Sequence, residues 1–310
     1  MSAIQWRVIW PEDSGGFVPS AAPTLTKCFD EIERDKLFWD SKTAREYRIT
    51  IRLWAEITGD PPIDALTADH ITAFTRGLMA RPGRGAPISP NTIRKHLRQL
   101  RAIMNATDRP DVRMPKIAFP PARKTAREVW QNDDLRRIAD ARTTIEPALT
   151  RPVDPAAWWR ALVILIYNTA WRIGTAMAAR WDWIQGNWIT VPAEAIKGRR
   201  ASRRWYLNRH AIRAIETVKQ NADPRIFPWS GCALTLQRHR RRILRGIGLS
   251  DGPRCGFHRL RRSSLSAIAK INPLVAAITA GHASGDVLAQ HYLSDDVIAA
   301  VMERLPQPFA

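Results

Sequence analysis

The residues most able to do chemistry are arginine, lysine, histidine and tyrosine side chains in the second half of the sequence. Arg172 follows a strongly apolar stretch and precedes Ile173-Gly174, where a turn would present it to a cleft. His258 and Arg261 are three residues apart, so a helix would place them on one face. An arginine fork can bind a phosphate through two parallel hydrogen bonds. The candidate set is Arg172, Lys197, His258, Arg261, His282 and Tyr292.

Each of these residues, taken alone, also has a structural explanation. An arginine near a buried helix is commonly a salt-bridge partner, a lysine in a basic turn is commonly solvated, and a lone histidine or tyrosine commonly belongs to the packing. Several other enzyme classes are excluded, because the sequence contains no GxxxxGK[ST] loop, no GxSxG elbow and no HExxH helix. The acidic residues do not cluster as a two-metal nuclease requires.

Charge indicates the class of partner. The chain contains 48 Lys and Arg against 29 Asp and Glu, a net charge of +19. Eighteen of these basic residues, with only three acidic ones, lie between Lys197 and Arg262. Such an excess attracts a polyanion, and nucleic acid is the favoured partner. A solvated basic face is the alternative.

Composition sets the broad class of the protein. A chain of 310 residues suggests about two domains. No apolar run approaches the roughly 20 residues of a membrane span, and the first ten residues do not resemble a signal peptide. Cys28, Cys232 and Cys255 form no CxxC pair, so we expect reduced thiols, no metal site and a cytoplasmic protein. No cofactor is expected.

The first domain is expected to be helical. Residues 1–23 are interpreted as an irregular tail and residues 24–107 as a helical domain. Ser89 and Pro90 predict the start of a helix, with an apolar stripe from Ile93 to Met104. A basic stripe on another face of this helix consists of Arg94, Arg98 and Arg101.

The second domain is expected to be mostly helical, with a small antiparallel sheet. Residues 108–127, rich in proline and basic residues, are interpreted as a linker, and residues 128–310 as the second domain. Trp158 to Ala170 is apolar on nearly all sides and predicts a buried helix. Trp188 to Val191 and Trp205 to Leu207 predict strands. Further helices are expected at 233–247, 258–270, 273–280 and 285–303.

Two more basic groups complete the candidate DNA-binding surface. One lies in the turn expected between the two strands, and the other lies along one face of the helix at 233–247. Such residues position a duplex through its phosphates without specifying its sequence. They are Arg199, Arg200, Arg238, Arg241, Arg242 and Arg245.

The order of the six candidate residues resembles the tyrosine recombinases, the phage-integrase and Xer-type family. The segment from Tyr167 to Gly174 resembles the first catalytic box of that family, and the segment from His258 to Arg262 resembles its HxLR[HR] element. Gly281-His282 resembles its LGH element, and His291 to Ser294 its nucleophile box. Thr175 stands where many members have an acidic residue. The resemblance covers the whole second domain, residues 128–310, and implies that this is the catalytic domain. More weakly, residues 24–107 resemble the helical core-binding (SAM-like) DNA-binding domain of the family.

The resemblance implies a two-domain DNA clamp that breaks and rejoins DNA. Tyr292 would attack a backbone phosphate, leaving a 3′-phosphotyrosyl link and a free 5′-hydroxyl. A second strand's 5′-hydroxyl would then attack the link and reseal the DNA, so neither metal nor ATP is needed.

The resemblance also implies a role for each of the other candidate residues. Arg172, Arg261 and His282 would stabilise charge on the non-bridging oxygens. Lys197 would protonate the leaving 5′-oxygen, and His258 would help to deprotonate the nucleophile.

The implied partners are double-stranded DNA with paired recognition sites, a homo-tetramer on two duplexes, and accessory directionality factors of a mobile genetic element. The apolar face after Tyr292, from Val297 to Met302, would pack against a neighbouring protomer or against its own domain. Three alternatives remain: a type IB topoisomerase, a catalytically inactive DNA-binding regulator, and a nucleic-acid-binding module of unrelated fold.

Overall fold

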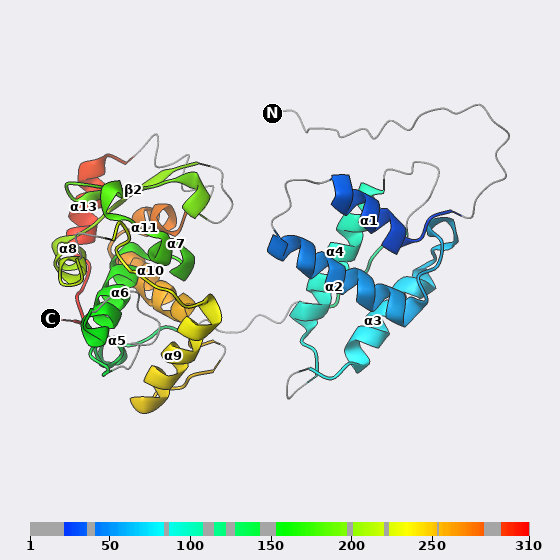
Figure 1. The fold of residues 1–310 in the computed structure, drawn as a ribbon, viewed down its shortest axis with the longest axis horizontal. Helices are drawn as coiled ribbons and strands as arrows, with labels where there is room; N and C mark the ends of the chain where they lie inside the picture. The colour runs from blue at the N-terminus through cyan, green and yellow to red at the C-terminus, as the bar shows by residue number, and fades with distance from the viewer. Residues whose placement is uncertain are drawn as a thin grey trace. The chain divides into compact units, whose positions relative to one another are not determined.

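The chain divides into two compact units, residues 1–125 and 126–310, in the computed structural model (Figure 1). Each unit has its own hydrophobic core. Among the described residues, no helix is long and apolar enough to cross a membrane. Five of the predicted site residues lie outside the described ranges: Lys197, Arg199, Arg200, His282 and Tyr292. The structure describes residues 22–35, 41–83, 87–107, 115–121, 128–142, 153–196, 201–219, 223–252, 254–281 and 293–309.

The first unit is helical, as its periodicity predicts. Its core contains Trp54 and Phe74, whose rings meet edge to face at 5.4 Å. Helix α4 begins at Pro90, where the Ser89 hydroxyl accepts a hydrogen bond from the Thr92 backbone N–H at 3.2 Å. The helices are α1 (Leu25–Asp35), α2 (Ser41–Thr58), α3 (Ala68–Ala80) and α4 (Pro90–Ala106).

Part of the segment interpreted as a linker packs on the first unit. Ile117 and Phe119 contact its core. The guanidinium groups of Arg94 and Arg101 lie over the Phe119 ring, at 5.6 and 5.0 Å from its centroid. Arg94 also donates a hydrogen bond to the Pro120 carbonyl. Two of the three arginines predicted to contact DNA on α4 therefore contact residues 119 and 120 in this structure.

The second unit is built around helix α6 (Pro155–Thr169), in which every residue from Ala161 to Thr169 is buried. Pro155 occupies its first position, and the Asp154 carboxylate accepts hydrogen bonds from two backbone N–H groups of the first turn. The other helices are α5 (Asn132–Ala139), α7 (Ile173–Ala178), α8 (Arg209–Glu216), α9 (Ala233–Gly246), α10 (Phe257–Ile271), α11 (Pro273–Ala280) and α13 (Asp295–Glu303).

A three-stranded antiparallel sheet, in the order β1-β2-β3, completes the second unit. Strand β2 (Trp188–Val191) has its predicted bounds, and β1 (Ile184–Gln185) was not expected. Strand β3 (Arg203–Tyr206) begins two residues earlier than expected, because Val191 at the end of β2 pairs with Arg203. The short helices α7 and α8 also lay outside the expectations. Of the helix expected at 285–303, the described part is helical only from Asp295, where α13 begins. The prediction was wrong at Ser294, which is extended and caps α13 by accepting a hydrogen bond from the Val297 N–H at 3.4 Å.

Candidate active site

The turn between α6 and α7 presents Arg172. Ala170 ends α6 in the left-handed conformation, with φ of +50°. A residue with a Cβ rarely adopts this conformation, which costs it roughly 1–2 kcal/mol. Arg172 follows two residues later as the N-cap of α7, and its side chain is exposed. Its guanidinium forms no hydrogen bond or ion pair with any other residue that the structure describes. The strained turn therefore leaves this cation available to a ligand.

Helix α10 brings Arg261 to the same turn. His258 lies in the first turn of α10 and is exposed, whereas Arg261 is only 6% exposed. The Arg261 guanidinium donates one hydrogen bond to the Ala170 carbonyl and another, of 2.6 Å, to the Ala280 carbonyl. It therefore ties the turn that carries Arg172 to the last residue of α11.

The electrostatics of this pair are unusual. Burial lowers the pKa of the Arg261 guanidinium to about 10, and the nearby positive charge of Arg172 also lowers it. Arg261 is held by carbonyl oxygens, each of which compensates only part of a full charge. Two arginines 89 residues apart are thus close enough to repel each other. An anion placed between them would relieve this repulsion.

Contacts between Arg259 and residues 128–130 anchor the N-terminal half of α10. Arg259 donates a hydrogen bond of 3.0 Å to the Val129 carbonyl and forms an ion pair of 3.1 Å with Glu128. Its guanidinium also lies 3.8 Å from the ring centroid of Trp130. The Trp130 backbone N–H in turn donates to the Ser263 hydroxyl at 2.7 Å. The beginning of the second unit is therefore fastened to the helix that carries His258 and Arg261.

The end of α11 is set by Gly281. This residue has φ of +68°, and its N–H donates to carbonyls of the last helical turn, which closes the helix. At the other end, the Asn272 side chain accepts hydrogen bonds from the N–H groups of Leu274 and Val275. The structure thus describes α11 up to Gly281, next to the position predicted for His282.

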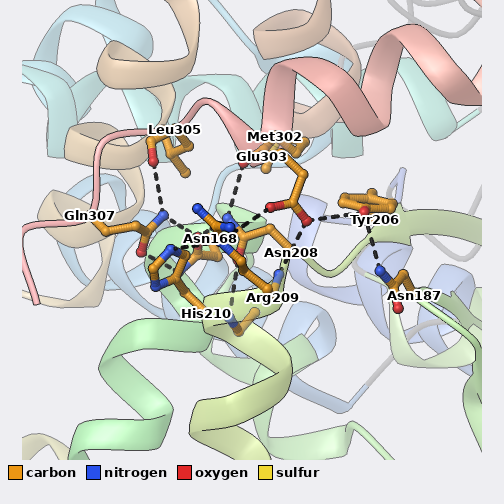
Figure 2. A network of polar contacts seen from close by, with 11 residues as sticks. Asn168, Asn187, Tyr206, Asn208, Arg209, His210, Met302, Glu303, Leu305 and Gln307 are labelled. Atoms are coloured by element: carbon orange, nitrogen blue, oxygen red, sulfur yellow. Dashed lines mark hydrogen bonds and ion pairs between the residues drawn. The ribbon is translucent and has the colours of Figure 1, made fainter. Parts of the chain in front are cut away.

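The segment after the predicted nucleophile packs on its own unit (Figure 2). Val301, Met302, Leu305 and Phe309 are buried in the second core, and the Phe309 ring meets the Tyr167 ring edge to face at 5.3 Å. Val301 and Met302 of the predicted apolar face thus pack within their own domain, whereas Val297 is 40% exposed.

A polar network holds that segment in place. The Asn168 side-chain oxygen accepts hydrogen bonds from the side-chain amides of Asn208 at 2.6 Å and Gln307 at 2.8 Å. Asn208 also donates to the Met302 carbonyl at 3.0 Å. Glu303 accepts from the Tyr206 hydroxyl at 3.0 Å, so α13 is joined to β3 as well as to α6 and α8 (Figure 2).

The basic face of α9 is partly as predicted. The four predicted residues, Arg238, Arg241, Arg242 and Arg245, are exposed. Arg245 is paired with Asp251 at 2.8 Å. A fifth arginine of this helix, Arg240, is buried instead, and it donates hydrogen bonds to the Cys255 carbonyl at 2.5 Å and the Gln237 side chain at 2.9 Å. Arg240 therefore joins α9 to the segment at residue 255 on its buried side.

The six predicted catalytic residues are therefore only partly observed together. Among the described residues, Arg172 and Arg261 lie near each other, and His258 shares α10 with Arg261. Within the same part of the chain, no group of three or more His, Cys, Asp or Glu side chains is placed to hold a metal ion. Thr175, where many recombinases have an acidic residue, donates a hydrogen bond of 3.3 Å to the Ala195 carbonyl.

Two arginines of the second unit were missed. The contacts that Arg259 makes with residues 128–130 leave no local trace in the sequence. Arg240, however, continues the apolar spacing of Leu236, Ile243 and Leu244, and this periodicity could have identified it as inward-facing.

Comparison with solved structures identifies the fold. The chain is similar to a lambda integrase tetramer bound to a Holliday junction, with 18% identity and a TM-score of 0.64 over 93% of this chain and 79% of that one. It is also similar to a lambda integrase (75–356) dimer bound to a COC′ core site, with 19% identity and a TM-score of 0.61 over 86% of this chain and 97% of that one. A third similar structure is the Tn1549 transposon integrase in complex with transposon right end DNA, with 14% identity and a TM-score of 0.61 over 91% of this chain and 99% of that one. No protein-family model matches the sequence, and no curated protein matches it.

Proposed function

Starting from its tyrosine-recombinase fold, we propose that this protein is a site-specific DNA recombinase of the integrase type. It cleaves and rejoins DNA through a 3′-phosphotyrosyl intermediate on Tyr292, without metal or ATP. The observation that carries the proposal is the approach of Arg261 to the turn that presents Arg172, where burial and then the charge of Arg172 lower the pKa of Arg261. A doubly cationic site of this kind suits a phosphate that gains charge in its transition state.

The division of labour follows from the chemistry of each side chain. Arg172 supplies an exposed guanidinium with unused donors. Arg261 has five N–H groups and uses two of them on carbonyls, which leaves others for the phosphate oxygens. His282 adds a donor, Lys197 protonates the leaving 5′-oxygen, and His258 takes the tyrosine proton. A tyrosine has an ordinary pKa of about 10, so removal of its proton needs the help of such cations and a base.

We further propose that the two units grip duplex DNA, with basic residues on α9 contacting phosphates. Arg238, Arg241 and Arg242 are exposed, as such contacts require. Affinity should fall steeply with added salt because counterions are released. Recombination between paired sites would use a homo-tetramer on two duplexes, and accessory factors would set the direction of recombination. We propose that the protein acts in the cytoplasm, associated with the nucleoid.

Covalent trapping tests this function. The protein is incubated with nicked fragments from its own genomic neighbourhood and denatured with SDS, and the DNA that remains attached is sequenced. Tyr292→Phe is the matched control, because it removes only the nucleophilic oxygen. Adducts formed by the wild type and lost in Tyr292→Phe are expected.

Other outcomes would redirect the proposal. Adducts that persist in Tyr292→Phe would identify a different nucleophile. Salt-sensitive DNA binding without adducts from any fragment would favour a DNA-binding regulator that lacks catalysis. Relaxation of supercoiled DNA by a single protomer, with no strand exchange, would favour a type IB topoisomerase.

A further inference from the structure

Strand β3 brings another arginine toward the turn at the end of α11. Successive side chains of a strand point to opposite faces, so Arg203 and Trp205 share one face and Arg204 and Tyr206 share the other. The Trp205 indole N–H donates to the Thr279 carbonyl, in the last turn of α11, at 3.4 Å. The face of β3 that carries Arg203 is therefore the face turned toward α11.

The Trp205 ring also marks how close this face is to Arg172. It meets the ring of Trp171 edge to face, with the ring centroids 5.6 Å apart. Trp171 is the residue directly before Arg172 and is 1% exposed, so this ring contact brings the Arg203 face of β3 to the chain segment that carries Arg172.

The guanidinium of Arg203 lies directly against Gly281. A methyl group added to Gly281 would lie 2.8 Å from Nη1 and 3.5 Å from Cζ of Arg203. The neighbouring residue, Ala280, accepts the hydrogen bond from Arg261. Two guanidinium groups, from β3 and from α10, therefore reach consecutive residues of one turn, and Arg261 is also close to Arg172.

We infer that Arg203 is a further catalytic residue of the proposed reaction, which contacts a non-bridging oxygen of the phosphate being cleaved. This inference rests on the proposed function. The contact would add a third guanidinium to Arg172 and Arg261 at the phosphate. Arg203 is half-buried, so its charge is less screened by water than that of an exposed arginine.

Arg204 provides a matched control one residue away. It is exposed on the opposite face of β3, paired with Asp295 at 2.9 Å and lying 4.7 Å from the Trp188 ring centroid. Loss of either arginine removes one positive charge from the same strand, but only Arg203 faces the end of α11.

The test measures single-turnover adduct formation on the DNA fragment recovered by covalent trapping, at saturating protein. Arg203→Ala is expected to slow the reaction by about 100-fold or more, as removal of one stabilising donor does elsewhere. Arg204→Ala should stay within about threefold of the wild type, because the exposed pair that it breaks contributes little. Arg203→Met, which retains most of the apolar stem, should be as slow as Arg203→Ala and keeps the test valid if the alanine variant folds poorly.

A charge-neutral substrate separates contact from a merely structural role. A methylphosphonate at the cleaved position removes one negative oxygen. The difference between Arg203→Met and the wild type should then shrink to less than about tenfold, whereas a methylphosphonate one position away should leave it unchanged. A defect equal on all three DNAs, or reaction of Arg203→Met within threefold of the wild type, overturns the inference alone. Absence of adducts from the wild type overturns the proposed function and the inference with it.

Discussion

His96 makes the first unit sensitive to acid. The side chain is 5% exposed on α4, and its Nδ1 lies 2.7 Å from the Thr50 hydroxyl of α2. Burial lowers the pKa of His96 from its ordinary 6.5 to about 4, and the nearby Lys95 lowers it further while Glu46 opposes the shift. The folded unit therefore holds this histidine in its neutral form.

The sign of the pH dependence follows from this lowered pKa. Neutral His96 is favoured in the folded state, so its contribution to stability is complete above pH 6.5 and is lost as the pH falls toward 4. The full difference of pKa corresponds to about 3 kcal/mol, and about 2 kcal/mol of it is lost by pH 5. A loss of 2 kcal/mol raises the open fraction of the unit by about 30-fold.

Hydrogen exchange in the full chain measures the loss of stability in the first unit itself. Protection of peptides covering 90–106, after correction for the intrinsic exchange rate, should fall by about 30-fold between pH 7.5 and pH 5 in the wild type. His96→Gln removes the titrating group, so its protection should change by less than about threefold. Peptides from α6 in the second unit serve as the internal reference. An equal loss of protection in both proteins would refute the assignment of this acid sensitivity to His96.

Three further perturbations follow from the second unit. Ala170→Gly removes the cost of a positive φ but also deletes a fully buried methyl group and loosens the unfolded chain, so the free energy of unfolding should change by less than about 1 kcal/mol in urea titration; a larger fall would mean that the turn is not strained. Gln307→Ala takes a donor from the buried Asn168 oxygen and should lower thermal stability by about 1–2 kcal/mol, whereas an unchanged melting temperature would show the network to be dispensable. Arg238→Ala should reduce the slope of log DNA affinity against log salt concentration by about one without changing the melting temperature. Arg240→Ala should instead lower the melting temperature, because it removes the buried hydrogen bond to the Cys255 carbonyl. The reverse result for these two arginines would contradict their assignment to the outside and inside of α9.

Local signals in the sequence were sufficient where the structure is itself local. Ser89 and Pro90 predict the first residue of α4, because the cap and the fixed φ of proline act within one turn. The i, i+3 spacing places His258 and Arg261 on one helix, which the structure contains as α10. Arg203 lay just outside the predicted strand, so the face it shares with Trp205 was not considered.

Contacts between distant segments were not predictable in the same way. The two carbonyls that hold Arg261 are 91 and 19 residues away, and no pattern near Arg261 identifies them. Phe119 lies in a proline-rich stretch without periodicity, so nothing indicated that Arg94 and Arg101 would cover its ring. These contacts depend on the whole fold of each unit, whereas the spacing of residues reports only the element that carries them.

The packing of residues 301–309 on the second core affects the order in which the two units can fold during synthesis. The first unit closes its core with residues up to Phe119, so it can fold while the rest of the chain is still being synthesised. The core of the second unit also needs Val301 to Phe309, which pack against α6 some 140 residues earlier in the sequence. Until residues 301–309 are synthesised, Asn168 lacks its hydrogen bond from Gln307 and Tyr167 lacks its ring contact with Phe309. A chain synthesised only as far as α11 would therefore carry Arg172 and Arg261 on a second core that still lacks Val301 to Phe309.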